Sequence, residues 1–297
     1  MVTVIIPLVI VIALGFILEL RRSLDERTLS GVSIYLLLPS LIFTSLLTTR
    51  MTLGGVLPLI AVALLTLGAL WVLGKAVARL RRYPRDEESL FLLTAIFMNA
   101  GNMGMPVALY AFGGAGLDLA VIWVLVLNVL MNTVAVYYAS RHRTPGARAL
   151  RTVLGLPSIY AAAAALVMRA LGLALPRFLL APLEMLGRAI IPIAQLMLGA
   201  QLAKSRHELR GQLAGAVLPN VMRLVVSPAV AFGFVILLGV HGLSAQVAIL
   251  LAAMPTAANV VVYTTEFGLQ PRRAAGVVAI STVASFVTLS VILLLVG

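Results

Sequence analysis

The stretch Asn99-Ala100-Gly101-Asn102-Met103-Gly104-Met105-Pro106 lies near the middle of a long apolar segment of this chain. Predominantly apolar residues flank it, in the ranges 91–98 and 107–112. Two asparagines, two glycines and a proline therefore occur where a membrane-spanning helix would lie deepest. Hydrocarbon offers backbone groups no water, so an interrupted helix persists at that depth only where it is buried in protein or lines a cavity. The stretch predicts a site for something polar.

Composition places the chain among polytopic helical membrane proteins. Hydrophobic residues make up 62% of its 297 residues and charged residues 11%, with a mean hydropathy of +1.10. A soluble domain has about 25% charged residues, and one membrane span needs about 20 mostly apolar residues. We expect ten spans, at residues 2–20, 31–49, 53–74, 88–113, 117–140, 152–172, 179–203, 211–240, 243–268 and 272–297.

The positive charge indicates topology and not a nucleic-acid partner. Of the 22 Lys and Arg residues, 17 lie in the odd-numbered connections between spans, three in the even-numbered ones and two within spans. Basic residues collect in cytoplasmic loops. The odd-numbered connections are therefore predicted to be cytoplasmic, which leaves both termini outside the cytoplasm. The predicted location is the cell (inner or cytoplasmic) membrane, with lipid around the spans.

Several chemistries are not expected from this sequence. It contains no cysteine, and its three histidines do not have the spacing of metal ligands. It contains no Walker-type loop, no paired acids within a span and no segment long enough for a soluble domain. We expect no cofactor, no metal site and no enzymatic activity. The first apolar run lacks a basic segment before it, so we expect a retained helix and not a cleaved signal peptide.

The ten predicted spans divide into two halves of five. Because five is odd, the second half must be inserted upside down relative to the first, as in many secondary transporters. Span 9 has its own interruption, Met254-Pro255-Thr256-Ala257-Ala258-Asn259, in the position that corresponds to the break in span 4. Paired breaks in corresponding spans are the best sequence indication of a transporter binding site.

The residues of the two breaks have complementary physical roles. Proline removes a backbone donor but fits the first turn of a helix, so Pro106 and Pro255 can separate two half-helices. Each second half-helix would present its N-terminus, with partial positive charge, near the membrane centre, which suits a carboxylate. The first half-helices end there with partial negative charge, so dipoles alone do not exclude a cation. Candidate binding residues are Asn99, Gly101, Asn102, Pro106, Pro255 and Asn259.

Other polar residues within the spans have two open interpretations each. Arg223 either counters a substrate carboxylate, or extends to the interface or bonds backbone carbonyls. Asn128 and Asn132 share one helix face and either meet the break or bond a neighbouring helix. Gln195 is a candidate for contact with substrate from the opposite wall. Glu266 is either a proton-coupling carboxyl or an interfacial cap.

The motif in span 4 resembles the signature of the auxin efflux carrier family. It reads Asn99-x-Gly101-Asn102-x-Gly104-x-Pro106, followed by Phe112-Gly113. This family includes plant PIN-type auxin exporters and bacterial permeases assigned to malonate or malate. The resemblance extends over nearly the whole chain and includes Pro255 and Asn259 in span 9 and the segment 199–202 in span 7. The long cytosolic loop of many plant members is absent here.

The resemblance implies an all-α fold related to bile-acid symporters, with two inverted five-helix repeats and broken spans 4 and 9 that cross at their centres. It implies scaffold helices in 1–50 and 144–205, and a mobile transport domain in 51–143 (crossover at 99–106) and 206–297 (crossover at 255–259). It also implies elevator-type movement and a homodimer through the scaffold. Family members bind an organic carboxylate at positions that correspond to Asn102, Pro106, Pro255 and Asn259.

These inferences predict a secondary carrier that moves a small organic anion by alternating access. A channel is the first alternative, but a pore usually needs several rotationally related copies of a filter. A ligand sensor would need an output surface, which the short connections do not provide. A sodium- or proton-coupled symporter of another substrate class also remains open.

Overall fold

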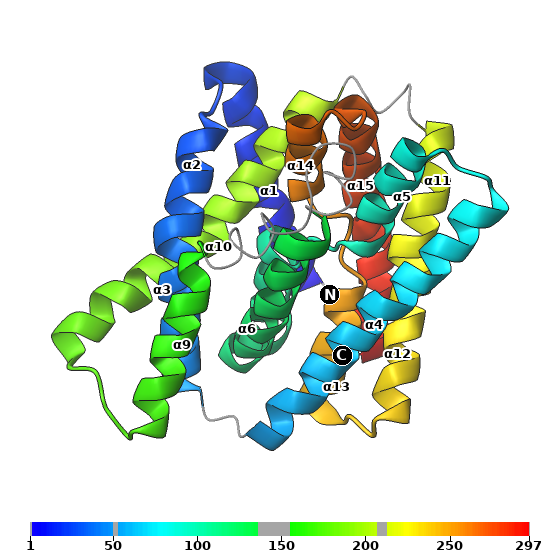
Figure 1. Ribbon diagram of the computed structural model, residues 1–297. Helices are drawn as coiled ribbons and strands as arrows, with labels where there is room; N and C mark the ends of the chain where they lie inside the picture. Colours follow the sequence, from blue (N-terminus) through cyan, green and yellow to red (C-terminus); the bar gives the residue numbers. More distant parts are fainter. Residues whose placement is uncertain (1, 50–52, 136–154, 207–212, 297) are drawn as a thin grey trace.

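The computed structural model describes residues 2–49, 53–135, 155–206 and 213–296, and within them every regular element is a helix (Figure 1). The α-helices are α1 (Val2–Arg22), α2 (Glu26–Val32), α3 (Leu38–Thr48), α4 (Leu53–Leu80), α5 (Arg85–Ile96), α6 (Met105–Leu130), α9 (Pro157–Ala170), α10 (Arg177–Ser205), α11 (Leu213–Val221), α12 (Ser227–Leu237), α13 (Gly242–Ala252), α14 (Asn259–Phe267) and α15 (Pro271–Val296). Four π-helical turns join some of them: η1 (Ser33–Leu37), η2 (Ala100–Gly104), η3 (Met131–Ala135) and η4 (Met222–Val226).

Seven helical stretches of the described chain are long and apolar enough to cross a membrane. They confirm the prediction of an all-helical, multi-pass membrane protein. The prediction of ten spans is not tested by this count, because predicted spans 4 and 9 are interrupted. Span 9, for example, consists of α13 with 11 residues and α14 with nine, separated by a break. Predicted span 6 contributes only the 14 residues of α9 to the described ranges.

The long helix α6 reverses direction at Gly113. This residue has φ 68° and ψ −159°, a conformation open to glycine because it has no β-carbon. A β-carbon on Gly116 would lie 2.7 Å from the carbonyl oxygen of Ala108. In a straight helix those residues would be about 12 Å apart along the axis. The reversal lies where the sequence predicts the end of span 4, and it brings Trp123 back to donate to Met98 Sδ at 3.1 Å.

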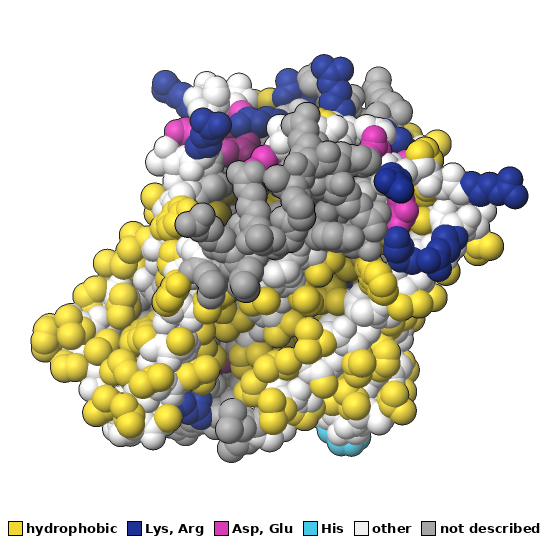
Figure 2. All heavy atoms as spheres, viewed as in Figure 1, with side chains coloured by type: hydrophobic (Ala, Val, Ile, Leu, Met, Phe, Trp, Pro, Cys, Tyr) yellow, Lys and Arg dark blue, Asp and Glu magenta, His cyan; other side chains and the backbone are white. Residues whose placement is uncertain are grey.

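Lys and Arg side chains gather at one end of the molecule, above a broad hydrophobic band (Figure 2). Ion pairs join the connections predicted to be cytoplasmic. Lys204 Nζ lies 2.6 Å from Glu26 Oε1, and Arg273 Nη2 lies 3.3 Å from Glu87 Oε1. This arrangement agrees with the charge pattern in the sequence. Six of the arginines used in that pattern lie outside the described residues: Arg50, Arg141, Arg143, Arg148, Arg151 and Arg210.

Helix α10 packs so closely against α1 and α3 that backbone atoms of neighbouring helices approach each other directly. A β-carbon on Gly199 would lie 2.0 Å from Ile12 O, and one on Gly15 would lie 2.2 Å from Leu196 O. Gly187 also brings α10 close to α3, since a β-carbon there would lie 2.8 Å from Leu41 Cα, and α3 in turn packs on α9. Small residues allow membrane helices this close approach, because dispersion contacts and not hydrophobic exclusion drive their association in lipid. A second set of contacts joins α4, α5, α6, α11, α12, α13, α14 and α15.

We expect Gly199→Ala to lower the thermal unfolding midpoint of the detergent-purified protein. The added methyl group overlaps the backbone of α1, and overpacking of this kind costs about 1–3 kcal/mol. The matched control is Gly233→Ala, in α12, where a β-carbon meets nothing within 4 Å. That control should be neutral or stabilising, because alanine favours a helix by about 1 kcal/mol over glycine. Equal midpoints for the two variants would contradict the close contact between α1 and α10.

Candidate functional site

The two interrupted spans meet and pair their backbones at the break. Helix α5 ends at Ile96 and is followed by extended chain at Phe97, and α13 ends at Ala252 and is followed by a turn at Ala253. Asn99 N donates to Pro255 O at 2.7 Å, and Ala257 N donates to Phe97 O at 2.9 Å. These two bonds flank an isolated antiparallel bridge between residues 98 and 256. Each break therefore supplies hydrogen-bond partners for groups that the other frees, as a low-dielectric interior requires.

Side chains from two further positions reinforce this junction. Thr256 Oγ1 donates to Thr94 O at 2.9 Å, a carbonyl in the last turn of α5. Thr256 N donates to Ser281 Oγ of α15 at 3.0 Å. Both Thr256 and Ser281 have no exposed surface. Sequence reasoning missed these residues, although Thr256 directly follows the proline of the second break.

Arg223 holds the ends of both first half-helices. Its Nη1 donates to Ile96 O at 2.7 Å and to Ala95 O at 3.4 Å, both at the end of α5. Its Nη2 donates to Ala252 O at 2.5 Å, at the end of α13, and also to the hydroxyl of Ser227. Ser227 Oγ donates to Ala252 O at 2.7 Å. Arg223 is fully buried. Of the roles predicted for this residue, the bonding of backbone carbonyls is the one that these distances describe.

The second half-helices begin differently from each other. The side chain of Asn99 caps η2, since its Oδ1 accepts from Asn102 N at 3.2 Å, and Pro106 lies in the first turn of α6 as predicted. Helix α14 begins at Asn259, after Ala258, with no side-chain cap. Its first turn is closed by backbone acceptors instead: Val260 N donates to Ala257 O at 3.1 Å, and Val261 N donates to Ala258 O at 3.0 Å.

Buried amide groups without partners occur beside the first break. Asn99 is 4% exposed, and its Nδ2 has no hydrogen-bond partner among the described residues. Gln195 on α10 is 1% exposed, and neither Nε2 nor Oε1 has a partner there. Helix α10 contacts η2, which follows Asn99 in the chain. Because a buried unpaired polar group is costly, both side chains are suited to meet a ligand or water.

The remaining predicted residues either bond to other helices or have open space around them. Asn132 Oδ1 accepts from the hydroxyl of Tyr263 in α14 at 3.1 Å, and Asn132 Nδ2 donates to Asn128 O at 2.8 Å. These bonds join two helices, one of the two roles predicted for the pair. Asn259 and Glu266 are exposed, at the two ends of α14. Gly101 has open space around the position of a β-carbon. The roles of these residues in binding or coupling stay predictions.

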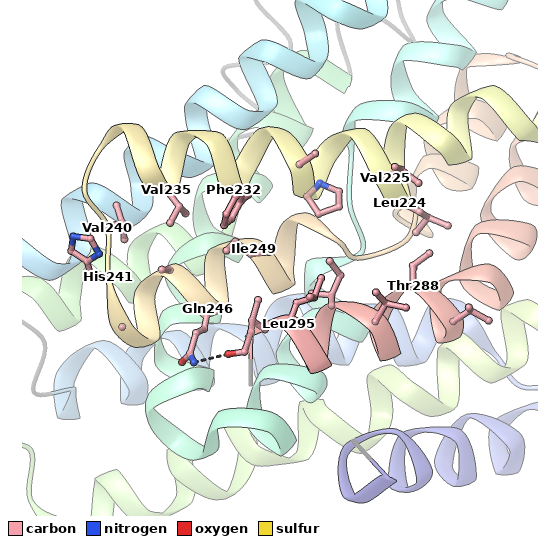
Figure 3. Close-up of a pocket in the computed structure, with 18 residues that line it drawn as sticks. Leu224, Val225, Phe232, Val235, Val240, His241, Gln246, Ile249, Thr288 and Leu295 are labelled. Carbon is pink, nitrogen blue, oxygen red and sulfur yellow. Dashed lines mark hydrogen bonds between the residues drawn. The ribbon is translucent and has the colours of Figure 1, made fainter.

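A cavity of about 870 Å³ contains none of the residues that pair the two breaks (Figure 3). It is formed by α12, α13 and α15 and is lined almost wholly by apolar side chains such as Phe232 and Leu295, which are 54% and 76% exposed. Its polar groups are few, and Gln246 Nε2 is already bonded to Val296 O at 2.6 Å. This cavity contains none of the predicted binding residues, and its chemistry suits an acyl chain better than an anion.

A smaller cavity of about 140 Å³ lies between α10 and the pair α14 and α15. Ala258, at the start of α14, lines it together with Gln201 and Lys204 of α10. Gln201 Oε1 is buried without a partner within the described chain. Lys204 Nζ lies 2.6 Å from Glu26 and 3.5 Å from Glu19. Sequence reasoning missed this cavity, because Lys204 was counted only as a basic residue of a connection.

No group of three or more His, Asp or Glu side chains within the described ranges has an arrangement that could hold a metal ion. The polar groups of the site are instead amides, hydroxyls and backbone groups, together with the charged side chains of Arg223, Lys204 and Glu26. Groups of these kinds form hydrogen bonds and ion pairs with small ligands.

Comparison with known proteins agrees with this geometry. The profile of a family described as membrane transport protein matches residues 1–293. The chain belongs to this family. It is the family of the auxin efflux carriers, so the predicted resemblance is confirmed.

Two archaeal relatives match almost end to end. An uncharacterized transporter of Methanothermobacter thermautotrophicus is 29% identical over 300 residues, which cover 96% of this chain and 95% of the relative. An uncharacterized transporter of Methanocaldococcus jannaschii is 25% identical over 305 residues, which cover 97% of this chain and 96% of the relative. This chain is therefore a membrane transporter of that family.

We expect Thr256→Val to destabilise the protein by about 1–3 kcal/mol, because the change leaves the buried carbonyl of Thr94 without its donor. The matched control is Thr265→Val, which removes a similar bond to Val261 O on the exposed side of α14. Thermal unfolding of the two purified variants is the measurement. A midpoint for Thr256→Val as high as that of the control would show that the junction does not depend on this bond.

Proposed function

We propose that this protein is a secondary carrier that moves a small organic anion across the membrane by alternating access, with the substrate held beside the two paired breaks. Membership of a transporter family supports the general activity. The uncapped N-terminus of α14, which borders a cavity that also contains a lysine, is the observation that carries the choice of an anion. The N-terminus of a helix carries partial positive charge, which favours a bound anion.

The size of the cavity between α10 and α14 supports a small substrate. A water molecule takes about 30 Å³ of liquid volume, so 140 Å³ corresponds to about five waters or one small organic acid. Lys204 provides a full positive charge at the same cavity. Two carboxylates, from Glu19 and Glu26, now face this lysine. A substrate carboxylate would compete with them for the ammonium group.

We further propose the organisation that the family resemblance implies. It consists of ten spans in two inverted repeats, with spans 4 and 9 crossing at residues 99–106 and 255–259. The scaffold would comprise α1, α2, α3, α9 and α10, and the transport domain the remaining helices. Two features support this division: close packing joins α10 to α1 and α3, and a second set of contacts joins the helices around the paired breaks. In an elevator-type movement the second group would slide along α10.

The proposed setting is the cytoplasmic membrane, with both termini outside. The gathering of Lys and Arg side chains at one end supports this orientation, since basic residues favour the cytoplasmic side (Figure 2). A homodimer through the scaffold helices is proposed from the family resemblance.

The experiment that tests this function starts with carboxylates and the purified protein. Acetate, malonate, succinate and benzoate would be screened by thermal shift against chloride at equal ionic strength, and ligands that stabilise the protein would then be assayed for uptake in proteoliposomes. We expect at least one to raise the midpoint and to enter with saturable kinetics. Stabilisation or uptake by none of them would contradict an organic-anion carrier, and non-saturable flux would indicate a channel.

We expect Lys204→Gln to raise the KM for that anion about tenfold, because the change removes one charge-assisted contact worth about 1.4 kcal/mol. The matched control is Arg206→Gln, two residues further along, which removes an exposed charge from the same end of the molecule. Initial uptake rates over a range of substrate concentrations give KM for both variants. Equal KM values would place the substrate away from the cavity between α10 and α14.

A further inference from the structure

Four oxygen atoms converge where the first half-helices end. Three are the carbonyl oxygens of Ala95, Ile96 and Ala252, and the fourth is the hydroxyl of Ser227. The carbonyls belong to the C-terminal turns of α5 and α13, which carry partial negative charge. In membrane transporters, half-helix C-termini and unwound carbonyls of this kind coordinate Na⁺. The set has the chemistry of a monovalent cation site.

The guanidinium group of Arg223 occupies this site. Each of the four oxygens accepts a hydrogen bond from this group. The distances from Arg223 Nη1 to the two α5 carbonyl oxygens are 2.7 Å for Ile96 and 3.4 Å for Ala95. None of the ion pairs found in the described chain includes Arg223, so helix ends and not a carboxylate balance its charge. Arginine does not lose its proton in proteins. A positive charge is therefore present at the junction at every working pH.

We propose that Arg223 is a resident counter-cation. Its permanent positive charge compensates the negative helix ends at this junction, as a bound Na⁺ would do in a cation-coupled carrier. Two consequences follow. The unaltered protein needs no monovalent cation at this position, so a Na⁺ gradient does not drive it through this site. Removal of the side chain exposes the oxygens and creates a site for guanidinium, and more weakly for Na⁺. The transport consequence rests on the proposed carrier function, whereas the binding consequence does not.

The binding test uses Arg223→Ala and soluble guanidinium at about 10 mM, well below denaturing concentrations. Arg223→Ala should unfold at a lower temperature than the unaltered protein, and guanidinium should raise its midpoint by about 2–4 °C, as expected for a ligand that binds only the folded state. Arg169→Ala is the matched control, because Arg169 Nη1 also donates to a carbonyl, Leu46 O, at 3.4 Å, outside the junction. Neither this control nor the unaltered protein should gain stability.

Several results would overturn the proposal. Guanidinium that stabilises Arg223→Ala no more than it stabilises Arg169→Ala would show that the oxygens do not form a cation site. If Arg223→Ala does not fold, Arg223→Lys provides the second test. It keeps a compact positive charge and should retain more thermal stability than Arg223→Met, which fills similar space without charge. Equal stability of these two variants would refute the role of the charge.

The transport test uses the unaltered protein in proteoliposomes. Replacement of Na⁺ by choline at equal ionic strength should change the initial rate of anion uptake less than twofold. A larger loss in choline would assign coupling to Na⁺ and contradict the resident cation. If no carboxylate is transported at all, the proposed function fails, while the guanidinium result on the purified variants still decides the inference about Arg223.

Discussion

A backbone group without a hydrogen-bond partner costs several kcal/mol in hydrocarbon, and this constraint determines how the centre of the protein is built. Two interrupted helices free donors and acceptors at the same depth. The protein pairs them with each other, through the bonds from Asn99 N to Pro255 O and from Ala257 N to Phe97 O. The remaining acceptors at the ends of α5 and α13 receive the guanidinium of Arg223.

In the structure the positive and negative helix ends at the two breaks are compensated unequally, whereas the sequence alone suggests that they balance. Two broken helices present two positive and two negative ends near the same point, and the dipoles roughly cancel. Arg223 compensates the negative ends, whereas the N-terminus of α14 has no side-chain cap. This difference in charge balance supports the anion that we propose at this centre. The proposal therefore depends on a residue that lies on neither broken helix.

The sequence allowed the membrane class, the positions of the two breaks and the end of span 4 at Gly113 to be predicted, because each depends on local composition or on a residue with special backbone geometry. The family resemblance rested on the same local motif. The partners of the breaks could not be predicted in this way. The bond between Arg223 and Ile96 joins residues 127 positions apart, and nothing in the pattern around either residue specifies the other.

The cavity between α10 and α14 could not be predicted either, because it also depends on contacts between residues that are distant in the sequence. Lys204 has the spacing and position of an ordinary cytoplasmic charge, and only the packing of α10 against α14 and α15 places it beside Ala258. Gln195 was recognised as a polar residue on a scaffold helix, but the absence of a partner for its amide within the described chain depends on packing from several helices. Non-local packing, and not composition, defines these parts of the site.

The hydrogen bonds across the junction also have a mechanical consequence. Two backbone bonds and the bond from Thr256 join the two breaks, and Arg223 joins the ends of α5 and α13 beside them, so separating the breaks would sacrifice all of these bonds together. In the proposed elevator-type movement the breaks would therefore travel as one body. The sliding surface would be the one between this body and α10, where Leu198, Leu202 and Val261 line the cavity with side chains whose contacts have no preferred direction. Sliding at that surface would break fewer hydrogen bonds than separation of the two breaks.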